Sequence, residues 1–196
     1  MNKALFLDRD GVMNRMVKYP SGWDSPQQPQ DVRLVADIEK VISWANANSV
    51  LVIEVSNQPG VAKGKMSQET SDAIEEKIHS FLEEKAAIID KTYICFHHPE
   101  AIVPELKKVC DCRKPKPGLL LQAAAGFKLD LENCVLLGDK GTDIETGKST
   151  DCTTIIYIHT EDTTDKVEAA TQAKADYTIK RISEVVPIIN NLFRSI

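Results

Sequence analysis

The sequence predicts an α/β fold, a three-layer arrangement in which a parallel sheet carries helices on both faces. Short apolar runs alternate along the chain with segments whose apolar residues recur at helical spacing, the pattern of right-handed strand–helix–strand crossovers. The run VLVIEV, residues 50–55, is almost continuously apolar, as expected of a parallel strand buried on both faces. The 196 residues suffice for one substantial domain, which we expect to span residues 1–196.

The expected elements can be placed one after another. Strands are expected at residues 4–7, 50–55, 92–96, 134–139, 153–158 and 176–179. Helices are expected over 36–48 and 67–87, and from about Pro117, Thr142, Asp165 and Ser183. The stretches 18–33 and 96–118 are expected to be irregular. No large lid domain is expected, because the segments between the first and second of the motifs described below, and between the second and third, are each used up by one or two secondary elements. Glu54 interrupts its apolar strand, and we expect it to be a partnered carboxylate or to lie at a strand edge.

The composition is that of an ordinary globular protein, with 42% hydrophobic and 27% charged residues. The net charge of −5 argues against broad binding to nucleic acids or to anionic membranes. No apolar run approaches the roughly 20 residues of a membrane span, and the first residues become acidic too early for a signal peptide. We therefore expect a cytoplasmic protein, and a monomer, because no long apolar helix demands a partner.

Polar side chains follow four of the predicted strands at the points where these strands end. Asp8 and Asp10 come after the first strand, a serine and an asparagine at 56–57 after the second, a cysteine cluster after the third, and Asp139 with Lys140 after the fourth. Because open parallel sheets bind ligands beyond the carboxyl ends of their strands, these residues are expected to converge on one site.

The residues of this site suit phosphoryl transfer. Carboxylates can hold Mg²⁺, while Ser56, Asn57 and nearby backbone N–H groups can donate hydrogen bonds to phosphate oxygens and Lys114 can add positive charge. Asp8 would attack phosphorus, and Asp10 would protonate the leaving oxygen and then deprotonate the hydrolytic water. Each motif alone is also typical of a polar turn. Their occurrence at successive strand ends favours the catalytic interpretation.

The segment CFHHPEAIVPELKKVCDC contains four soft or borderline metal ligands. They are Cys95, His97, Cys110 and Cys112, a set that suits a closed tetrahedral structural zinc site. The alternative is a pair of free core cysteines beside a surface histidine. Such a zinc ion would order the loop over about 95–113 and would orient the cationic residues that follow it. The remaining cysteines, Cys134 and Cys152, are expected in the core.

Four segments together resemble the motifs of the haloacid dehalogenase-type phosphatases: FLDRDGVMN, VSNQPGVAKG, CRKPKPG and LGDKGTDIETG. The likeness spans almost the whole chain and is closest to the branch that contains heptose-bisphosphate and histidinol-phosphate phosphatases. It implies a Rossmann-like fold of the capless type. It also implies that Asp8 is the nucleophile, that Asp10 is the acid/base, and that both join Asp139 at Mg²⁺. Ser56 and Lys114 complete the implied catalytic set.

The resemblance favours a small phosphorylated metabolite as substrate, in particular the 7-phosphate of D-glycero-D-manno-heptose 1,7-bisphosphate. The residues expected to contact the substrate are Tyr19, Ser56, Asn57, Gln58, Arg113, Lys114 and Lys140. The loop PSGWDSPQQPQ is longer than the corresponding loop of the branch, and histidinol phosphate is the alternative substrate. Two other classes stay open at this point, a phosphorylated receiver module and a zinc-containing nucleic-acid module. The acidic balance of the chain disfavours the second of these.

Overall fold

The computed structural model describes residues 2–159, 168 and 172–194. Its centre is a six-stranded sheet with the strand order β5-β4-β1-β6-β7-β8, in which every neighbouring pair is parallel. The predicted strands are confirmed within a few residues. The strands are β1 (Ala4–Leu7), β4 (Leu51–Asn57), β5 (Lys91–Cys95), β6 (Val135–Gly138), β7 (Thr153–Tyr157) and β8 (Tyr177–Ile179).

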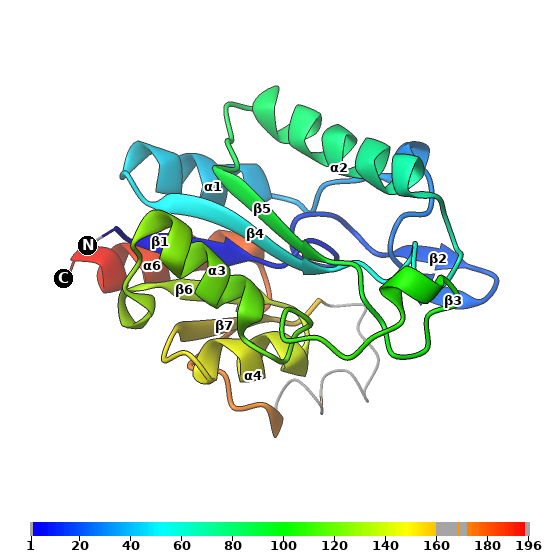
Figure 1. Ribbon diagram of the computed structural model, residues 1–196. Helices are drawn as coiled ribbons and strands as arrows, with labels where there is room; N and C mark the ends of the chain where they lie inside the picture. The colour runs from blue at the N-terminus through cyan, green and yellow to red at the C-terminus, as the bar shows by residue number, and fades with distance from the viewer. Residues whose placement is uncertain (1, 160–167, 169–171, 195–196) are drawn as a thin grey trace.

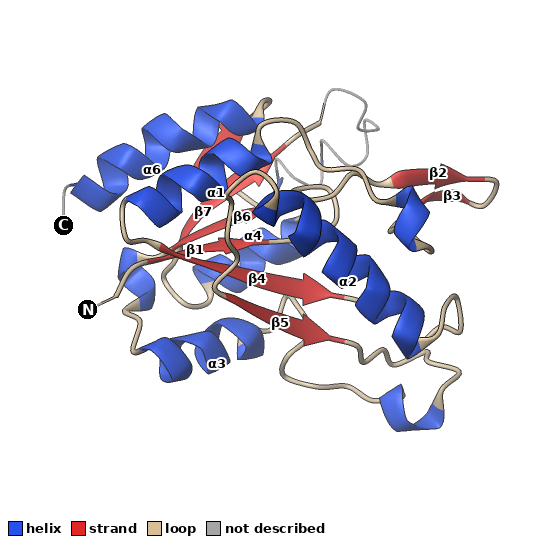
Figure 2. Ribbon diagram, turned by 90° about the horizontal axis from the view of Figure 1, so that it is seen from above, coloured by secondary structure: helices blue, strands red, loops and turns tan. Residues whose placement is uncertain are grey.

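Helices cover both faces of this sheet (Figures 1 and 2). One face carries α1 (Ile38–Ala47), α2 (Gln68–Glu83) and α6 (Val185–Arg194), and the other carries α3 (Gly118–Phe127) and α4 (Gly141–Lys148). Side chains of β1 alternate between the two layers, because Leu5 and Leu7 pack with the first group of helices while Ala4 and Phe6 pack with α3. The predicted three-layer α/β fold is thus confirmed. The helix expected from Asp165 falls largely outside the described residues.

The second predicted helix is shorter than expected. Ser67 caps α2, since its hydroxyl accepts a hydrogen bond from Thr70 N at 3.2 Å, and this confirms the predicted start. The helix ends at Glu83 rather than near Ala87. Ala86 has a left-handed backbone with φ +55°, and Ala87 N donates back to Leu82 O at 3.0 Å. This turn closes the helix before the next strand.

The stretch 18–33 is not wholly irregular, and that prediction was wrong. It contains most of an antiparallel hairpin of β2 (Val17–Tyr19) and β3 (Gly22–Asp24), which projects beyond the carboxyl ends of the central strands (Figure 2). The Tyr19 hydroxyl donates to Asp31 Oδ2 at 2.6 Å and accepts from Gln27 N at 2.9 Å. The hairpin is therefore tied to the chain that returns from it. Within the described residues, no helix combines the length and the apolar character needed to cross a membrane.

Candidate active site and metal centre

The carboxyl ends of β4, β1 and β6 lie side by side and bring the predicted site residues together. Asp8 directly follows β1 and is buried between two cations. Its Oδ1 lies 2.9 Å from Lys114 Nζ, and its Oδ2 lies 3.4 Å from Lys140 Nζ. Burial alone would raise the pKa of Asp8, but these lysines outweigh burial and hold the pKa well below its usual range. Asp8 is therefore an ionised carboxylate held in a fixed place.

A group of three buried carboxylates forms around Asp8. Oxygen atoms of Asp8, Asp139 and Asp143 all lie within 4.8 Å of one another. Asp139 follows β6, and Asp143 comes from the first turn of α4, a position that the sequence analysis did not single out. Burial raises the pKa of Asp143 to about 6, against the lowering effect of Lys114.

Two glycines make room for these carboxylates. A Cβ atom on Gly11, whose φ is +96°, would lie 2.1 Å from Asp139 Oδ2. A Cβ on Gly138 would lie 2.2 Å from the Cβ of Asp143. The three carboxylates carry more negative charge than Lys114 and Lys140 can balance, and carboxylate oxygens are hard ligands. The donor set thus fits a hard divalent cation.

Asp10, the predicted acid/base, is held differently from Asp8. Its Oδ2 accepts hydrogen bonds from Gln58 Nε2 at 2.6 Å and from Arg9 Nη2 at 3.3 Å. Its backbone carbonyl accepts one from Lys140 Nζ at 3.3 Å. Among the described residues, its carboxylate is not part of the group around Asp8. The prediction that Asp10 is a Mg²⁺ ligand stays a prediction.

The last two residues of β4, Ser56 and Asn57, and the following Gln58 lie around Lys114 and Asp10. Asn57 Oδ1 accepts from Lys114 N, and Asn57 Nδ2 donates to Lys114 O, both at 3.0 Å, so Asn57 fixes the backbone of Lys114. The Lys114 ammonium lies 2.6 Å from Asp143 Oδ1 and donates to Val55 O at 2.8 Å. Ser56 Oγ accepts from Gln58 Nε2 at 2.8 Å. Gln58 thus links the predicted phosphate-binding hydroxyl to the predicted acid/base.

Tyr19 and Arg113, both predicted to contact the substrate, form hydrogen bonds with other parts of the chain in this structure. The Tyr19 hydroxyl is used inside the hairpin, and burial together with Asp31 raises the pKa of Tyr19 to about 12. Arg113 Nη1 donates to the carbonyl of His97 at 3.3 Å. That contact ties Arg113 to the cysteine loop, next to Lys114 in sequence.

The four predicted zinc ligands do form a cluster. The Sγ atoms of Cys95, Cys110 and Cys112 lie 3.2–3.5 Å apart, and His97 Nδ1 lies 3.3 Å from the Sγ of Cys112. None of the three cysteines is in a disulfide. Three thiols and an imidazole converging at these distances fit a tetrahedrally coordinated metal ion. Cys134 and Cys152 are buried in the core, as predicted.

A second cluster of charged residues is connected to Asp10 through Arg9. Glu54 is fully buried, and its Oε2 lies 3.5 Å from His79 Nε2, which confirms the prediction that it is partnered. Glu75 Oε1 lies 3.1 Å from the same nitrogen, while Glu75 Oε2 lies 3.0 Å from Arg9 Nη1. Burial raises the pKa of Glu54 to about 8, and the two glutamates raise the pKa of His79 to about 10. The sequence analysis gave no role to Arg9, Glu75 or His79.

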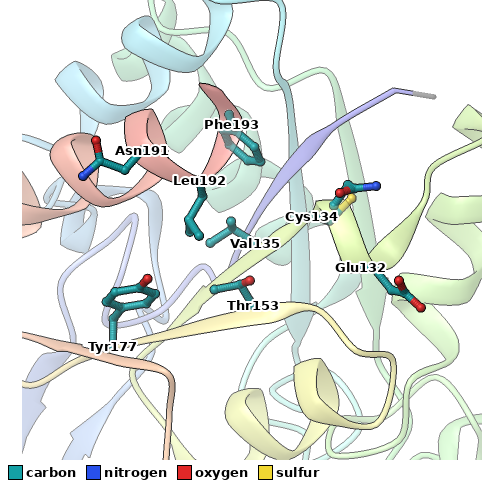
Figure 3. Close-up of a pocket in the computed structure, with 9 residues that line it drawn as sticks. Glu132, Cys134, Val135, Thr153, Tyr177, Asn191, Leu192 and Phe193 are labelled. Atoms are coloured by element: carbon teal, nitrogen blue, oxygen red, sulfur yellow. The ribbon is translucent and has the colours of Figure 1, made fainter. Parts of the chain in front are cut away.

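A pocket of about 390 Å³ lies at the opposite, amino-terminal ends of the strands (Figure 3). It lies between the starts of β6, β7 and β8 and the end of α6. Its lining residues are Glu132, Asn133, Cys134, Val135, Thr153, Tyr177, Asn191, Leu192 and Phe193. None of the carboxylates, lysines or metal ligands described above lines this pocket. It is therefore separate from the candidate site.

Comparison with known proteins places the chain in a family. A family model described as HAD-hydrolase-like matches residues 111–185. The D-glycero-alpha-D-manno-heptose-1,7-bisphosphate 7-phosphatase of Photorhabdus laumondii is 31% identical over 183 residues, which cover 93% of this chain and 97% of that protein. The chain belongs to the HAD-hydrolase-like family. Membership confirms the resemblance predicted from the four motifs and the predicted reaction class, phosphoric monoester hydrolysis.

Other relatives and solved structures match along almost the whole chain. The D-glycero-beta-D-manno-heptose-1,7-bisphosphate 7-phosphatase of Haemophilus influenzae is 30% identical over 192 residues, 98% of this chain and 99% of that protein. The D,D-heptose 1,7-bisphosphate phosphatase of B. bronchiseptica, solved with magnesium and phosphate, has a TM-score of 0.78 at 22% identity, with both chains fully covered. The corresponding enzyme of Burkholderia thailandensis has a TM-score of 0.61 at 17% identity and covers 92% and 93% of the two chains. These structures show the shared fold.

Proposed function

We propose that this chain is a Mg²⁺-dependent phosphatase that removes the 7-phosphate of D-glycero-D-manno-heptose 1,7-bisphosphate through an aspartyl phosphate at Asp8. The observation that carries the proposal is the state of Asp8. It is ionised, lies between Lys114 and Lys140, and lies within 4.8 Å of two further carboxylates. Relatives about 30% identical over most of the chain are named for this substrate, in both anomeric forms, and this supports the substrate assignment.

The residues divide the reaction into two displacements. Asp8 attacks phosphorus, and the bond between phosphorus and the sugar oxygen breaks as Asp10 gives that oxygen a proton. Asp10 then takes a proton from water, whose oxygen attacks phosphorus and frees Asp8 and inorganic phosphate. Lys114 and Lys140 balance the charge on the phosphoryl oxygens, and Ser56 donates a hydrogen bond to one of them.

The two metal sites would have different roles. Asp8, Asp139 and Asp143 would hold Mg²⁺, which offsets the repulsion between the Asp8 carboxylate and the phosphoryl group. Cys95, His97, Cys110 and Cys112 would hold a structural zinc ion with no open coordination position. That site would fix the backbone next to Arg113 and Lys114. A monomeric state and a cytoplasmic location stay predictions.

Measuring phosphate release tests this proposal. The substrates are the heptose bisphosphate, a heptose monophosphate, histidinol phosphate and a small aryl phosphate, each assayed with Mg²⁺. We expect the highest kcat/KM for the bisphosphate, and we expect Asp8→Asn to lose turnover of every substrate because an amide is a poor nucleophile. Appreciable activity of purified Asp8→Asn protein would refute the mechanism. A preference for histidinol phosphate would overturn the substrate assignment alone.

A further inference from the structure

We infer that Arg9 and Glu75 position the carboxyl group of Asp10 for proton transfer to the leaving oxygen. This inference rests on the proposed function, because it concerns the acid step of that reaction. Neither residue belongs to the predicted site, and Glu75 comes from the middle of α2, far from Asp10 in sequence. Helix α2 would thus help to position the acid/base, although none of its residues would touch the substrate.

Arg9 contacts both carboxylate oxygens of Asp10. It lies between the two catalytic aspartates in sequence, yet its side chain turns inward and is only 2% exposed. Its Nε lies 3.3 Å from Asp10 Oδ1 and its Nη2 lies 3.3 Å from Asp10 Oδ2, a two-pronged contact with both carboxylate oxygens. The planar guanidinium therefore fixes the plane of the carboxyl group as well as its position, which a single point charge cannot do.

Gln58 closes a triangle with these two residues. Arg9 Nη2 donates to Gln58 Oε1 at 2.6 Å, and Gln58 Nε2 donates to Asp10 Oδ2 at 2.6 Å. Both carboxylate oxygens of Asp10 thus have fixed donors, and each donor is fixed by another group. Any shift of Arg9 would move Asp10 directly and also through Gln58.

Glu75 fixes Arg9 from the other side. Its Oε2 lies 3.0 Å from Arg9 Nη1, whereas Arg9 uses its Nε and Nη2 for the contacts with Asp10 and Gln58. Its Oε1 lies 3.1 Å from His79 Nε2, and that nitrogen lies 3.5 Å from the fully buried Glu54. Helix α2 and strand β4 thus hold the far end of the guanidinium, while Asp10 lies at its near end.

Protein stability alone does not explain why these charged residues are buried together. Buried ion pairs generally contribute little more than well-packed apolar residues of similar size. This cluster instead places several ionised groups in the interior, where removing any one leaves its partners unpaired. Because one end of the cluster is the proposed acid/base, the simplest function is to hold that group in one orientation.

The leaving group provides a selective test of this role. An alkoxide leaving from an alkyl phosphate needs a proton from Asp10, whereas a nitrophenolate is stable without one. The second displacement is common to both substrates and also uses Asp10. The quantity to compare is therefore kcat/KM, which reports only the steps up to departure of the leaving group.

The experiment measures kcat/KM for a sugar phosphate and for p-nitrophenyl phosphate in wild type, Arg9→Lys and Glu75→Gln. The matched controls are Arg33→Lys, whose guanidinium donates to the backbone carbonyls of Gln30 and Val32, and Glu76→Gln, an exposed neighbour of Glu75 on α2. We expect Arg9→Lys and Glu75→Gln to lower the value for the sugar phosphate about 10- to 100-fold more than the value for the aryl phosphate. The controls should change neither. In an Asp10→Asn background, Arg9→Lys should add no further loss for the sugar phosphate.

The ratio of the two kcat/KM values is independent of the fraction of folded enzyme, so partial unfolding of a variant cannot produce the expected result. Equal losses on both substrates would overturn the inference and indicate a purely structural role for Arg9 and Glu75. Unchanged values for both would also overturn it. A wild-type protein that hydrolyses neither substrate would instead refute the proposed function.

Discussion

Replacing Gly11 by alanine should separate the effect of backbone strain from the effect of displacing Asp139, a proposed Mg²⁺ ligand. Gly11 follows Asp10 and has φ +96°, a conformation that is unfavourable for residues with a Cβ atom. Its added Cβ would also lie 2.1 Å from Asp139 Oδ2 and 2.5 Å from Asp139 Cγ. Gly22 at the hairpin turn offers a matched control. It has φ +116°, and a Cβ atom there would meet nothing within 4 Å.

The two effects have different sizes and different readouts. A side chain forced into such a backbone conformation costs about 1–3 kcal/mol, so both variants should lose about that much free energy of unfolding. Relieving the contact in Gly11→Ala requires Asp139 to move by about 1 Å, since ordinary carbon–oxygen contacts exceed about 3 Å. A displacement of that size in a catalytic constellation costs about 100-fold in rate.

The assay combines urea unfolding with kcat/KM for a small aryl phosphate and titration with Mg²⁺. Gly11→Ala should lose about 100-fold in kcat/KM and should require more Mg²⁺ for half-maximal activity. Gly22→Ala should retain activity despite a similar loss of stability. Wild-type activity in Gly11→Ala, or an equal loss of activity in Gly22→Ala, would show that a Cβ atom at Gly11 does not act by displacing Asp139.

Three further predictions concern the metals, the substrate and pH. EDTA should stop activity, and added Mg²⁺ should restore it. Elemental analysis should find about one zinc ion per chain in the wild type and much less in Cys110→Ser. Wild-type protein without zinc would contradict the prediction that the cysteine cluster binds zinc. Arg113→Ala should lower kcat/KM for a sugar bisphosphate about 30- to 150-fold, which corresponds to about 2–3 kcal/mol, because only the bisphosphate has a second anionic group. The value for an aryl phosphate should change little, and equal losses for the two substrates would exclude this role. The pKa of Glu54 is raised to about 8 and that of His79 to about 10, so their stabilising contributions are complete below pH 4.5 and 6.5 and are lost as pH rises through the raised values. The free energy of unfolding should therefore fall as pH rises from 5 to 10, and Glu54→Gln should flatten this slope; an equally steep profile in that variant would exclude Glu54 as its source.

Much of the fold could be predicted because burial imposes regular patterns. The strands follow from short apolar runs, and β4 in particular needs apolar side chains on both faces. The convergence of Asp8, Asp139 and Lys140 follows from the same patterns, since the ends of neighbouring parallel strands meet at one edge. The cysteine cluster was predictable because its ligand types are rare and closely spaced.

The parts that were missed depend on contacts that no local pattern encodes. The strands of the hairpin are three residues long and partly exposed, too short to show an alternating pattern. Arg9 is adjacent to two aspartates and looks like a solvated turn residue, yet it is buried because Glu75 meets it from a distant helix. Asp143 lies within the motif LGDKGTDIETG. Its spacing of four residues from Asp139, together with Gly138, could have indicated it.

The position of β1 in the middle of the sheet has a consequence for how the chain folds. Its residues pair on one side with Leu51–Glu54 and on the other with Val135–Leu137. The strand that precedes Asp8, the proposed nucleophile, is synthesised before both of its partner strands and is enclosed only after β6 has emerged. Pairings so distant in sequence slow folding, and until β6 arrives β1 presents an open, apolar edge. Chains truncated before Val135 should therefore aggregate rather than form a smaller active domain.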